Sequence, residues 1–312
     1  MNRCITCLIL ALSALAAAEP APIPCRIAYL AKLHYAPVII GLADGLFAKA
    51  GIEATPVLVG PGSGILTAEA LATGAADAAA MGDGPAIISS TRDPLPVLLG
   101  AYVAAERQHR LVARPGITIA SPADLVGKRV AVMQGSSTYA GLMLLFKKHS
   151  IAAASVTVVN LNPKDMAAAL QSSQADVAAA SDPIPDLILR KIPGSSAAGD
   201  LAGLGTDYPY CLLTSRRWAV TNPDGCRRLR EALTVACTVI TTEPERAVRL
   251  IAAATKDSES DTRRWMDLCQ WSLRSPEQTL PSLLPLAQAM ADAGALARPA
   301  RLADASLPPA SR

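Results

Sequence analysis

The chain has 312 residues, 51% of them hydrophobic, which is long enough for two domains with substantial cores. Its formal net charge is +3, and its Lys and Arg residues are scattered along the sequence rather than clustered. Because nucleic-acid-binding proteins gather basic residues in a patch or stripe, this distribution argues against that class of function.

The first 18 residues have the pattern of a secretory signal peptide. Arg3 precedes an apolar run over residues 4–15, and three alanines follow at 16–18. Because this run is too short to span a bilayer and ends in small residues, we predict cleavage after Ala18 and export to the periplasm. The alternative, a buried N-terminal helix, is disfavoured by the proline-rich residues 20–24. No later segment has the roughly 18 uninterrupted apolar residues of a membrane helix.

From residue 25 onward, short apolar segments alternate with amphipathic ones, which predicts a mainly parallel sheet covered by helices. The first series has predicted strands at residues 26–30, 53–59, 76–81 and 96–101, and predicted helices at 36–50, 63–73 and 84–90. The second series begins after residues 114–116. It has a short helix at 121–125, strands at 128–133, 155–160 and 176–180, and helices at 138–149, 163–172 and 183–191.

The last third of the chain is predicted to be mainly helical. A short apolar run at residues 210–214 precedes helices at 224–241, 244–255, 260–272 and 276–293. These helices need a partner for their apolar faces, so we expect them to pack on the first series. The chain would then cross twice between two lobes, near 108–113 and 206–214, which makes a hinge.

The predicted fold is therefore α/β with two lobes, each a doubly wound, mainly parallel sheet, with the extra C-terminal helices on the first lobe. Lobe 1 would be discontinuous, comprising residues 25–110 and 208–297, and lobe 2 would comprise 111–207. The proline-rich tail over 298–312 is expected to be disordered.

One segment occurs twice in the chain, at residues 70–83 and again at 169–182, and the two copies align without gaps. Each copy reads as the end of a helix, a turn, a buried strand and then an aspartate, Asp83 or Asp182. In open α/β sheets, side chains beyond the carboxyl ends of strands face the ligand crevice. Two copies therefore predict two lobes that present matched edges to one cleft.

Two glycine- and hydroxyl-rich loops are candidates for binding a ligand. Ser136, Ser137 and Thr138 follow a predicted strand and open a helix, where free backbone N–H groups and hydroxyls suit an anion. Ordinary helix capping explains them equally well. In the first lobe, Gly62, Ser63 and Gly64 join a strand to a helix, and the glycines allow a ligand to approach the backbone.

Three further residues are candidates for ligand contact beside these loops. Tyr35 follows the first strand, where it could stack on a ligand or lie at the rim of the cleft. For Asp83 and Asp182, helix capping is the favoured interpretation over ligand contact. If they do contact the ligand, a carboxylate opposite an anion-binding loop would suit a zwitterion.

The numbers and positions of the cysteines and histidines limit which disulfides and metal sites the protein can form. Removal of the leader takes Cys4 and Cys7 and leaves five cysteines, so at most two disulfides can form in an oxidising compartment. Cys226 with Cys269 is the first pair to test, because both flank C-terminal helices, but their spacing does not fix connectivity. With three scattered histidines, each expected at the surface, and no Cys/His cluster, we predict no metal site.

The chain resembles the extracytoplasmic solute-binding proteins of ABC importers, in the sulfonate/nitrate/taurine and thiamine-precursor (SsuA/THI5-like, NMT1) group. The likeness covers roughly residues 26–217. It rests on Pro37 with residues 45–53, on the strand at 77–81, on residues 125–132 with Gly135-Ser136-Ser137, and on Leu170 through Asp182-Pro183.

This resemblance implies a type II periplasmic-binding fold, a small-molecule ligand held between the lobes, no cofactor, and a monomer that delivers its ligand to an inner-membrane ABC permease. Carried over by position, the ligand-contacting residues would be Tyr35, Gly62, Ser63, Gly64, Gly82, Asp83, Ser136, Ser137, Thr138, Ser181 and Asp182. The group often has an aromatic residue just before the Asp-Pro pair, where this chain has Ser181, so the resemblance does not favour taurine or an alkanesulfonate specifically.

Three functions are compatible with these patterns. A binding protein for a small anionic or zwitterionic solute, without catalysis, is favoured by the export signal. An enzyme of the same fold, acting on a pyrimidine or related biosynthetic precursor, is the alternative, but the sequence does not assemble a nucleophile, a base and an orienting group. A ligand-sensing ectodomain is disfavoured, because no anchor or output domain is recognisable.

Overall fold

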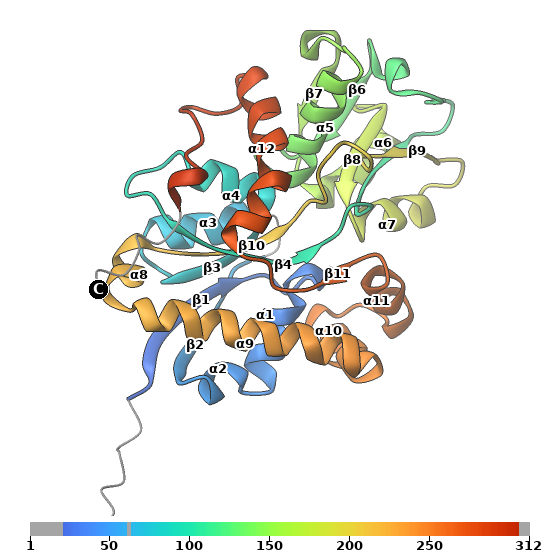
Figure 1. Ribbon diagram of the computed structural model, residues 1–312. Helices are drawn as coiled ribbons and strands as arrows, with labels where there is room; N and C mark the ends of the chain where they lie inside the picture. Colours follow the sequence, from blue (N-terminus) through green and yellow to red (C-terminus); the bar gives the residue numbers. More distant parts are fainter. Residues whose placement is uncertain (1–20, 61–63, 306–312) are drawn as a thin grey trace, which may run out of the picture.

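The computed structural model describes residues 21–60 and 64–305, and these form two β-sheets flanked by helices (Figure 1). The first sheet has the strand order β11-β4-β10-β3-β1-β2, and the second has the order β7-β6-β8-β5-β9. The predicted signal peptide, Gly62, Ser63 and residues 306–312 lie outside the described residues. Among the described helices, none has the length and apolar character needed to cross a membrane.

The first sheet combines parallel strands with strands that return from later in the chain. Its strands are β1 (Ile23–Tyr29), β2 (Ile52–Leu58), β3 (Ala78–Gly82), β4 (Val97–Ala104), β10 (Tyr210–Thr214) and β11 (Gln270–Trp271). β1 pairs in parallel with β2 and β3, whereas β10 runs antiparallel between β3 and β4, and β11 runs antiparallel to β4. The α/β prediction is confirmed, and the sheet is mixed because the chain re-enters it through β10.

The second sheet repeats this plan with one antiparallel strand inside it. Its strands are β5 (His109–Ala113), β6 (Arg129–Val132), β7 (Thr157–Asn160), β8 (Val177–Ser181) and β9 (Ser196–Asp200). β6 pairs in parallel with β7 and β8, and β5 runs antiparallel to β8 and β9. In each sheet, therefore, a strand adjoining a crossing lies antiparallel to the strand of the repeated segment.

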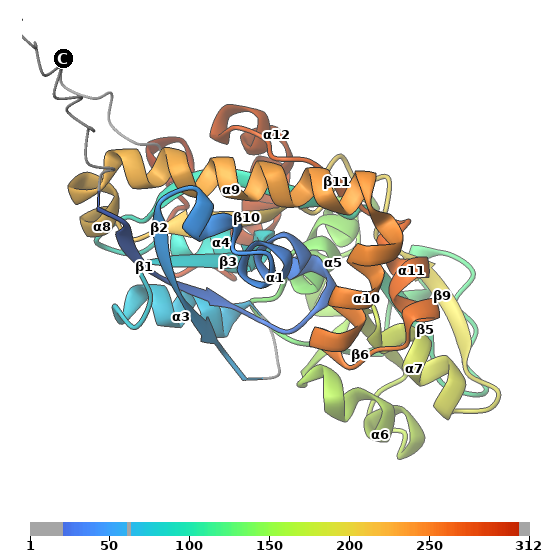
Figure 2. The same ribbon diagram turned by 90° about the horizontal axis from the view of Figure 1, so that it is seen from below.

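Two helical layers cover the first sheet. One face packs against α1 (Ala36–Ala43), α2 (Leu46–Lys49), α9 (Pro223–Thr242) and α10 (Pro244–Thr255), and the other against α3 (Ile65–Ala72), α4 (Asp83–Ser89) and α12 (Pro276–Asp292) (Figures 1 and 2). Strand β3 shows why: Ala78 and Ala80 belong to the core under α9, while Ala79 and Met81 belong to the core under α12. Successive side chains of a strand point to opposite faces, so an uninterrupted apolar run is buried on both.

The second sheet has its own helical layers, and one of them joins the two sheets. α6 (Met166–Gln171) and α7 (Ile184–Lys191) cover one face through a small separate core. On the other face, α5 (Ser137–Lys148) packs against α12 and α4, so its apolar residues belong to the same core as the first sheet. This shared core fixes one side of the junction between the sheets.

The opposite side of the junction is polar. α11 (Glu259–Met266), beside α10, lies against α7 (Figure 2). Arg264 of α11 pairs with Asp186 of α7 at 2.6 Å, and Arg190 pairs with Asp261 at 3.2 Å. Helix α8 (Arg216–Thr221) and five short 3₁₀ turns complete the fold: Leu33–Tyr35, Pro122–Leu125, Ala153–Ser155, Pro163–Asp165 and Ala303–Ala305.

Several expected elements differ in detail. The helix predicted over residues 36–50 divides at Gly45, whose φ of 63° interrupts it. The helix predicted over 260–272 ends at Met266, and Gln270–Trp271 forms an edge strand instead. Strands β5 and β9 and helix α8 were not predicted, and residues 108–113 were expected only as a crossing between the lobes.

Part of the C-terminal tail packs against the rest of the chain. Residues 298–305 pack on the first sheet's side, with Leu302 and Ala305 buried and the Arg301 N–H donating to the Ser90 carbonyl at 3.2 Å. The expectation of a disordered tail over 298–312 stays a prediction about its motion, and residues 298–305 are packed in this structure. Apolar side chains at 302 and 305 supply the burial that the proline content of the tail does not suggest.

The chain crosses between the sheets twice, from β4 to β5 after Ala104 and from β9 to β10 after Asp200. The division into lobes at 110/111 and 207/208 stays a prediction about how these sheets move relative to one another.

Candidate functional site

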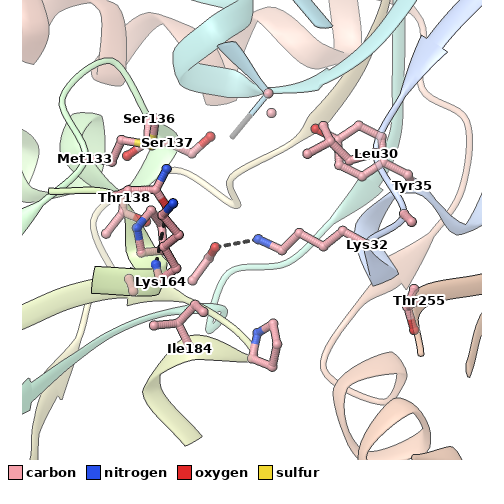
Figure 3. A pocket seen from close by; sticks show the side chains of 18 of the residues that line it. Leu30, Lys32, Tyr35, Met133, Ser136, Ser137, Thr138, Lys164, Ile184 and Thr255 are labelled. Carbon is pink, nitrogen blue, oxygen red and sulfur yellow. Dashed lines mark hydrogen bonds between the residues drawn. The ribbon is translucent and has the colours of Figure 1, made fainter. Parts of the chain in front are cut away.

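A cavity of about 670 Å³ lies between the two sheets (Figure 3). The carboxyl ends of the parallel strands in both sheets border it, as expected for ligand sites in open α/β sheets. Polar and aromatic side chains line it from both sides, among them Lys32, Tyr35 and Tyr210 from the first sheet, and His109, Ser136, Ser137, Thr138 and Ser181 from the second.

The antiparallel strands place two aromatic rings at the ends of the repeated segments. Tyr210, at the start of β10, lies opposite Gly82 in the register, and His109, at the start of β5, lies opposite Ser181. All four residues line the cavity. Each copy of the repeat thus supplies one small residue, and each crossing supplies the ring beside it.

Lys32 is the cation nearest to the centre of this arrangement. It follows β1 and donates from Nζ to Ser181 Oγ at 2.7 Å, so it reaches from the first sheet to the second (Figure 3). Burial lowers the pKa of Lys32 to about 8, although Asp182 and Asp257 oppose the shift. The sequence analysis missed this residue, because a single lysine after a strand is an ordinary surface pattern.

The N-terminus of α5 forms the facing wall. Ser136 caps the helix by accepting from the Tyr139 N–H at 3.2 Å, and Ser137 and Thr138 occupy its first turn. Capping is therefore confirmed for Ser136, and anion binding by the three residues stays a prediction. The positive end of the helix dipole and the hydroxyls favour a negative charge at this wall.

Two glycines allow this wall to approach the first sheet. A Cβ at Gly82 would lie 2.5 Å from Ser137 Oγ, and one at Gly84 would lie 2.7 Å from the Ser136 carbonyl carbon. The second clash is with backbone, so a side chain at Gly84 would force the two sheets apart.

Tyr35 and Gly64 also line the cavity, and their contact with a ligand stays a prediction. Tyr35 is only 2% exposed and packs edge-on against Tyr210, with ring centroids 5.6 Å apart, so it is a wall rather than a rim residue. Burial raises the pKa of the Tyr35 phenol.

Asp83 and Asp182 do not line the cavity among the described residues. Asp83 is fully buried, neither of its oxygens has a hydrogen-bond partner in the described part of the chain, and burial raises its pKa to about 7. Asp182 binds Arg110, which also contacts Asp186 at 2.5 Å. The favoured interpretation of helix capping is wrong for both, since no capping hydrogen bond from either side chain is found at α4 or α7.

The cavity lining has an excess of positive charge. Lys32, Lys164 and Lys256 line it, and among the described lining residues Asp257 is the one carboxylate. The zwitterion argument depended on Asp83 and Asp182, so the geometry now favours an anion.

The histidine prediction is wrong for two of the three residues. His34 and His109 are each 1% exposed, and only His149 lies at the surface. The His34 ring stacks on Tyr210 at 4.8 Å, and His109 packs edge-on against Tyr208 at 4.6 Å. Burial lowers the pKa of both imidazoles, so both are neutral at pH 7.

The five cysteines of the described chain are all free, so the suggested Cys226–Cys269 disulfide is not formed in this structure. Cys226 is buried and Cys269 partly buried. Over residues 21–60 and 64–305, no group of three His, Cys, Asp or Glu side chains is arranged to hold a metal ion.

Comparison with known proteins agrees with this architecture. A binding protein of Brucella abortus is 26% identical over 235 residues, which cover 74% of this chain and 71% of the relative. The taurine-binding periplasmic protein of Escherichia coli is 33% identical over 141 residues, 45% of this chain and 43% of that protein.

Solved structures share the fold at lower identity. The periplasmic aliphatic sulphonate-binding protein SsuA from Escherichia coli matches with a TM-score of 0.80 and 19% identity, covering 93% of both chains. The desulfurization enzyme DSZB matches with a TM-score of 0.68 and 17% identity, covering 92% of this chain and 97% of that one. The family model described as NMT1/THI5 like matches residues 32–247, most of the described chain. The chain belongs to the NMT1/THI5-like family.

Proposed function

We propose that this protein is the periplasmic substrate-binding component of an ABC importer and that it captures a small organic anion between its two sheets. The observation that carries the proposal is the position of Lys32, which faces the N-terminus of α5 across a cavity of about 670 Å³. A partly buried ammonium opposite a helix N-terminus stabilises an anion from two sides. The named functions of the sulfonate- and taurine-binding relatives support the same class of ligand.

Capture requires that the ligand contact both sheets. An anion bound to Lys32 and to the first turn of α5 would do so, and it would stabilise the closed arrangement by its differential affinity for that state. The two crossings would serve as the hinge. We infer that the protein acts as a monomer and passes its ligand to an inner-membrane permease, as a periplasmic receptor does.

An enzyme is the second candidate, because DSZB shares the fold and because the Thr138 hydroxyl lies 2.8 Å from His109 Nδ1. This hydroxyl–imidazole pair resembles a nucleophile with its base. In such a site, a third group holds the other imidazole nitrogen, but in the described chain His109 Nε2 has no partner. The pair therefore favours binding over catalysis.

Isothermal titration of the mature protein with methanesulfonate, ethanesulfonate, pentanesulfonate and nitrate tests the proposal. We expect at least one of these anions to bind with a dissociation constant of about 10 μM or tighter. Lys32→Met should weaken that binding about 10- to 100-fold, since it removes one charge-assisted hydrogen bond. Lys49→Met, on the exposed surface of α2, is the matched control and should bind as the wild type does.

Two results would contradict the proposal. The first is the absence of binding by any of the four anions to protein that has been unfolded, dialysed and refolded to remove bound ligand. The second is turnover of an anion during titration, seen as product by mass spectrometry, which would establish the enzyme instead.

A further inference from the structure

His109 is a buried side chain whose hydrogen bonding is half complete. It opens β5 opposite Ser181, lines the cavity, and is 1% exposed. Its Nδ1 lies 2.8 Å from Thr138 Oγ1, whereas Nε2 has no partner within the described residues. Leaving a buried polar atom unpaired costs about 1–3 kcal/mol, so such an atom in a ligand cavity points to a partner that arrives with the ligand.

The ring of His109 is packed on one side and hydrogen-bonded on another. It packs edge-on against Tyr208, whose hydroxyl donates to the Leu201 carbonyl at 2.6 Å and so holds that ring in place. Thr138 lies in the first turn of α5, which is anchored by the Ser136 cap. Both nitrogens of His109 are therefore held in fixed directions.

The charge and tautomer of His109 follow from its neighbours. Burial, and then the positive charge of Lys32, lower its pKa, so the ring is neutral at pH 7. In the described chain, His109 Nδ1 is the one hydrogen-bond partner of the Thr138 hydroxyl. This contact is compatible with either direction; when the hydroxyl donates to Nδ1, the ring proton resides on Nε2, which becomes a neutral N–H donor.

We propose that Nε2 of His109 donates a hydrogen bond to the anionic head group of the bound solute, and that Thr138 fixes the tautomer that makes it a donor. This inference rests on the proposed function and names a second recognition group for it. Lys32 contributes a positive charge from the side of the first sheet, and His109 contributes a hydrogen bond of fixed orientation from the second. A head group with at least two acceptor oxygens, such as a sulfonate or a sulfate ester, can satisfy both at once.

Affinity measurements on three variants test this assignment with the same four anions. His109→Phe keeps a ring against Tyr208 but removes the donor, and it should weaken binding at least tenfold. Thr138→Val removes only the hydroxyl and should weaken binding several-fold, while Thr138→Ser should restore it to within about threefold of the wild type. His149→Phe, at an exposed histidine, is the control and should have no effect.

The tautomer itself is visible by nuclear magnetic resonance, because only three histidines contribute ring signals. In protein labelled with ¹⁵N-histidine, His109 should carry its proton on Nε2 without ligand, and that resonance should shift on saturation with the anion that binds. Thr138→Val should give a mixture of tautomers, and Thr138→Ser should return the single form. A merely structural histidine would not respond to ligand at Nε2.

The possible results distinguish a failure of this inference from a failure of the proposed function on which it rests. If the wild type binds none of the four anions, the proposed function fails and this inference fails with it. If the wild type binds and folded His109→Phe binds equally well, only the role of His109 is overturned. A proton on Nδ1 in the wild type would overturn it even if His109→Phe does not fold.

Discussion

Asp77 and Asp176 hold the same position in the two copies of the repeated segment, and each binds an arginine of a neighbouring strand. Asp77 accepts from the backbone N–H, Nε and Nη2 of Arg26 at 3.0, 2.9 and 2.8 Å. Asp176 accepts from the same three groups of Arg129 at 3.0, 3.0 and 2.8 Å. The base of each copy is thus a clamp that ties the repeated strand to the strand beside it.

The tips of the two copies differ. After β3 comes Asp83, which is fully buried and unpaired among the described residues, whereas after β8 comes Asp182, which is held by Arg110. Arg110 also binds Asp186, whose other oxygen accepts from Arg264 and Trp265 of α11. The aspartates just before the two repeated strands, Asp77 and Asp176, therefore stabilise each sheet by itself. The ion pairs around Asp182 connect the second sheet to α11 at the junction between the sheets.

The largest expected difference between the copies concerns pH and stability at the tips. Asp83 loses its proton near pH 4 in the unfolded chain but only near pH 7 when folded, so it lowers the stability of the wild type as pH rises from 4 to 7. Asp83→Asn should lack this fall. At pH 8 the variant should therefore gain about 4 kcal/mol relative to the wild type, compared with pH 4.

Asp182→Asn is the matched change in the other copy. Burial raises the pKa of Asp182 as well, but Arg110 opposes the shift. This variant should lose about 1 kcal/mol at pH 8, because Arg110 keeps only Asp186 as a carboxylate partner. Urea unfolding at pH 4, 6 and 8 measures both. Parallel stability curves for Asp83→Asn and the wild type would show that Asp83 is hydrated or paired in solution.

The next difference concerns the clamps at the base. The Asp176 side chain is 9% exposed and binds Arg114 as well as Arg129, whereas the Asp77 side chain is 22% exposed and binds Arg26. Asp176→Ala should cost about 2–3 kcal/mol and Asp77→Ala about 1 kcal/mol. Chemical denaturation at pH 7 gives both values, and equal losses would show that the second arginine adds nothing.

The same clamps set the behaviour in acid. The arginines hold the pKa of both carboxyls below the usual range. Their contribution to stability is therefore present above about pH 4 and is lost as pH falls through the lowered values. The two alanine variants should accordingly lose less stability than the wild type between pH 5 and pH 3.

The repeat itself could be recognised in the sequence, and so could its place at the edge of a cleft. Apolar alternation also predicted the core strands and most helices, since buried residues determine that pattern. Strand β9 escaped because its sequence Ser-Ala-Ala-Gly-Asp is short and mostly exposed, so no apolar period marks it. Local patterns predicted ligand contact by Tyr35 and by the start of α5, because strand ends and helix starts leave a sequence signature, and both line the cavity in the structure.

The sequence patterns did not predict the roles of residues that depend on a partner far away in the chain. The role of Lys32 depends on its hydrogen bond to Ser181, which lies 149 positions away. The role of His109 depends on its place in the antiparallel register with β8. The roles of Asp83 and Asp182 depend on whether an arginine faces them, which sequence order does not reveal. Such pairings arise only when the two sheets are brought together.

The role of Lys32, which reaches across the cavity to Ser181, can be tested by the pH dependence of anion binding. Lys32 is charged below its pKa of about 8, and a bound anion would raise that pKa. Affinity should therefore be constant from pH 6 to 7.5 and then fall by up to about tenfold per pH unit above 8. Titration calorimetry of the wild type and Lys32→Met measures this. A fall of equal steepness in Lys32→Met would assign the titrating group elsewhere.

The smallest expected effect belongs to Ser181, the residue of the second copy that Lys32 contacts. Its hydroxyl accepts from Nζ at 2.7 Å, a bond that a bound anion would replace with a stronger one. Ser181→Ala should therefore change anion affinity by no more than about threefold, whereas Lys32→Met changes it far more. If Ser181→Ala instead weakened binding as much as Lys32→Met does, the hydroxyl would have to orient Lys32 in the bound state. Ser181 would then be part of the recognition site, rather than only a hydrogen-bond partner of Lys32 in the absence of the anion.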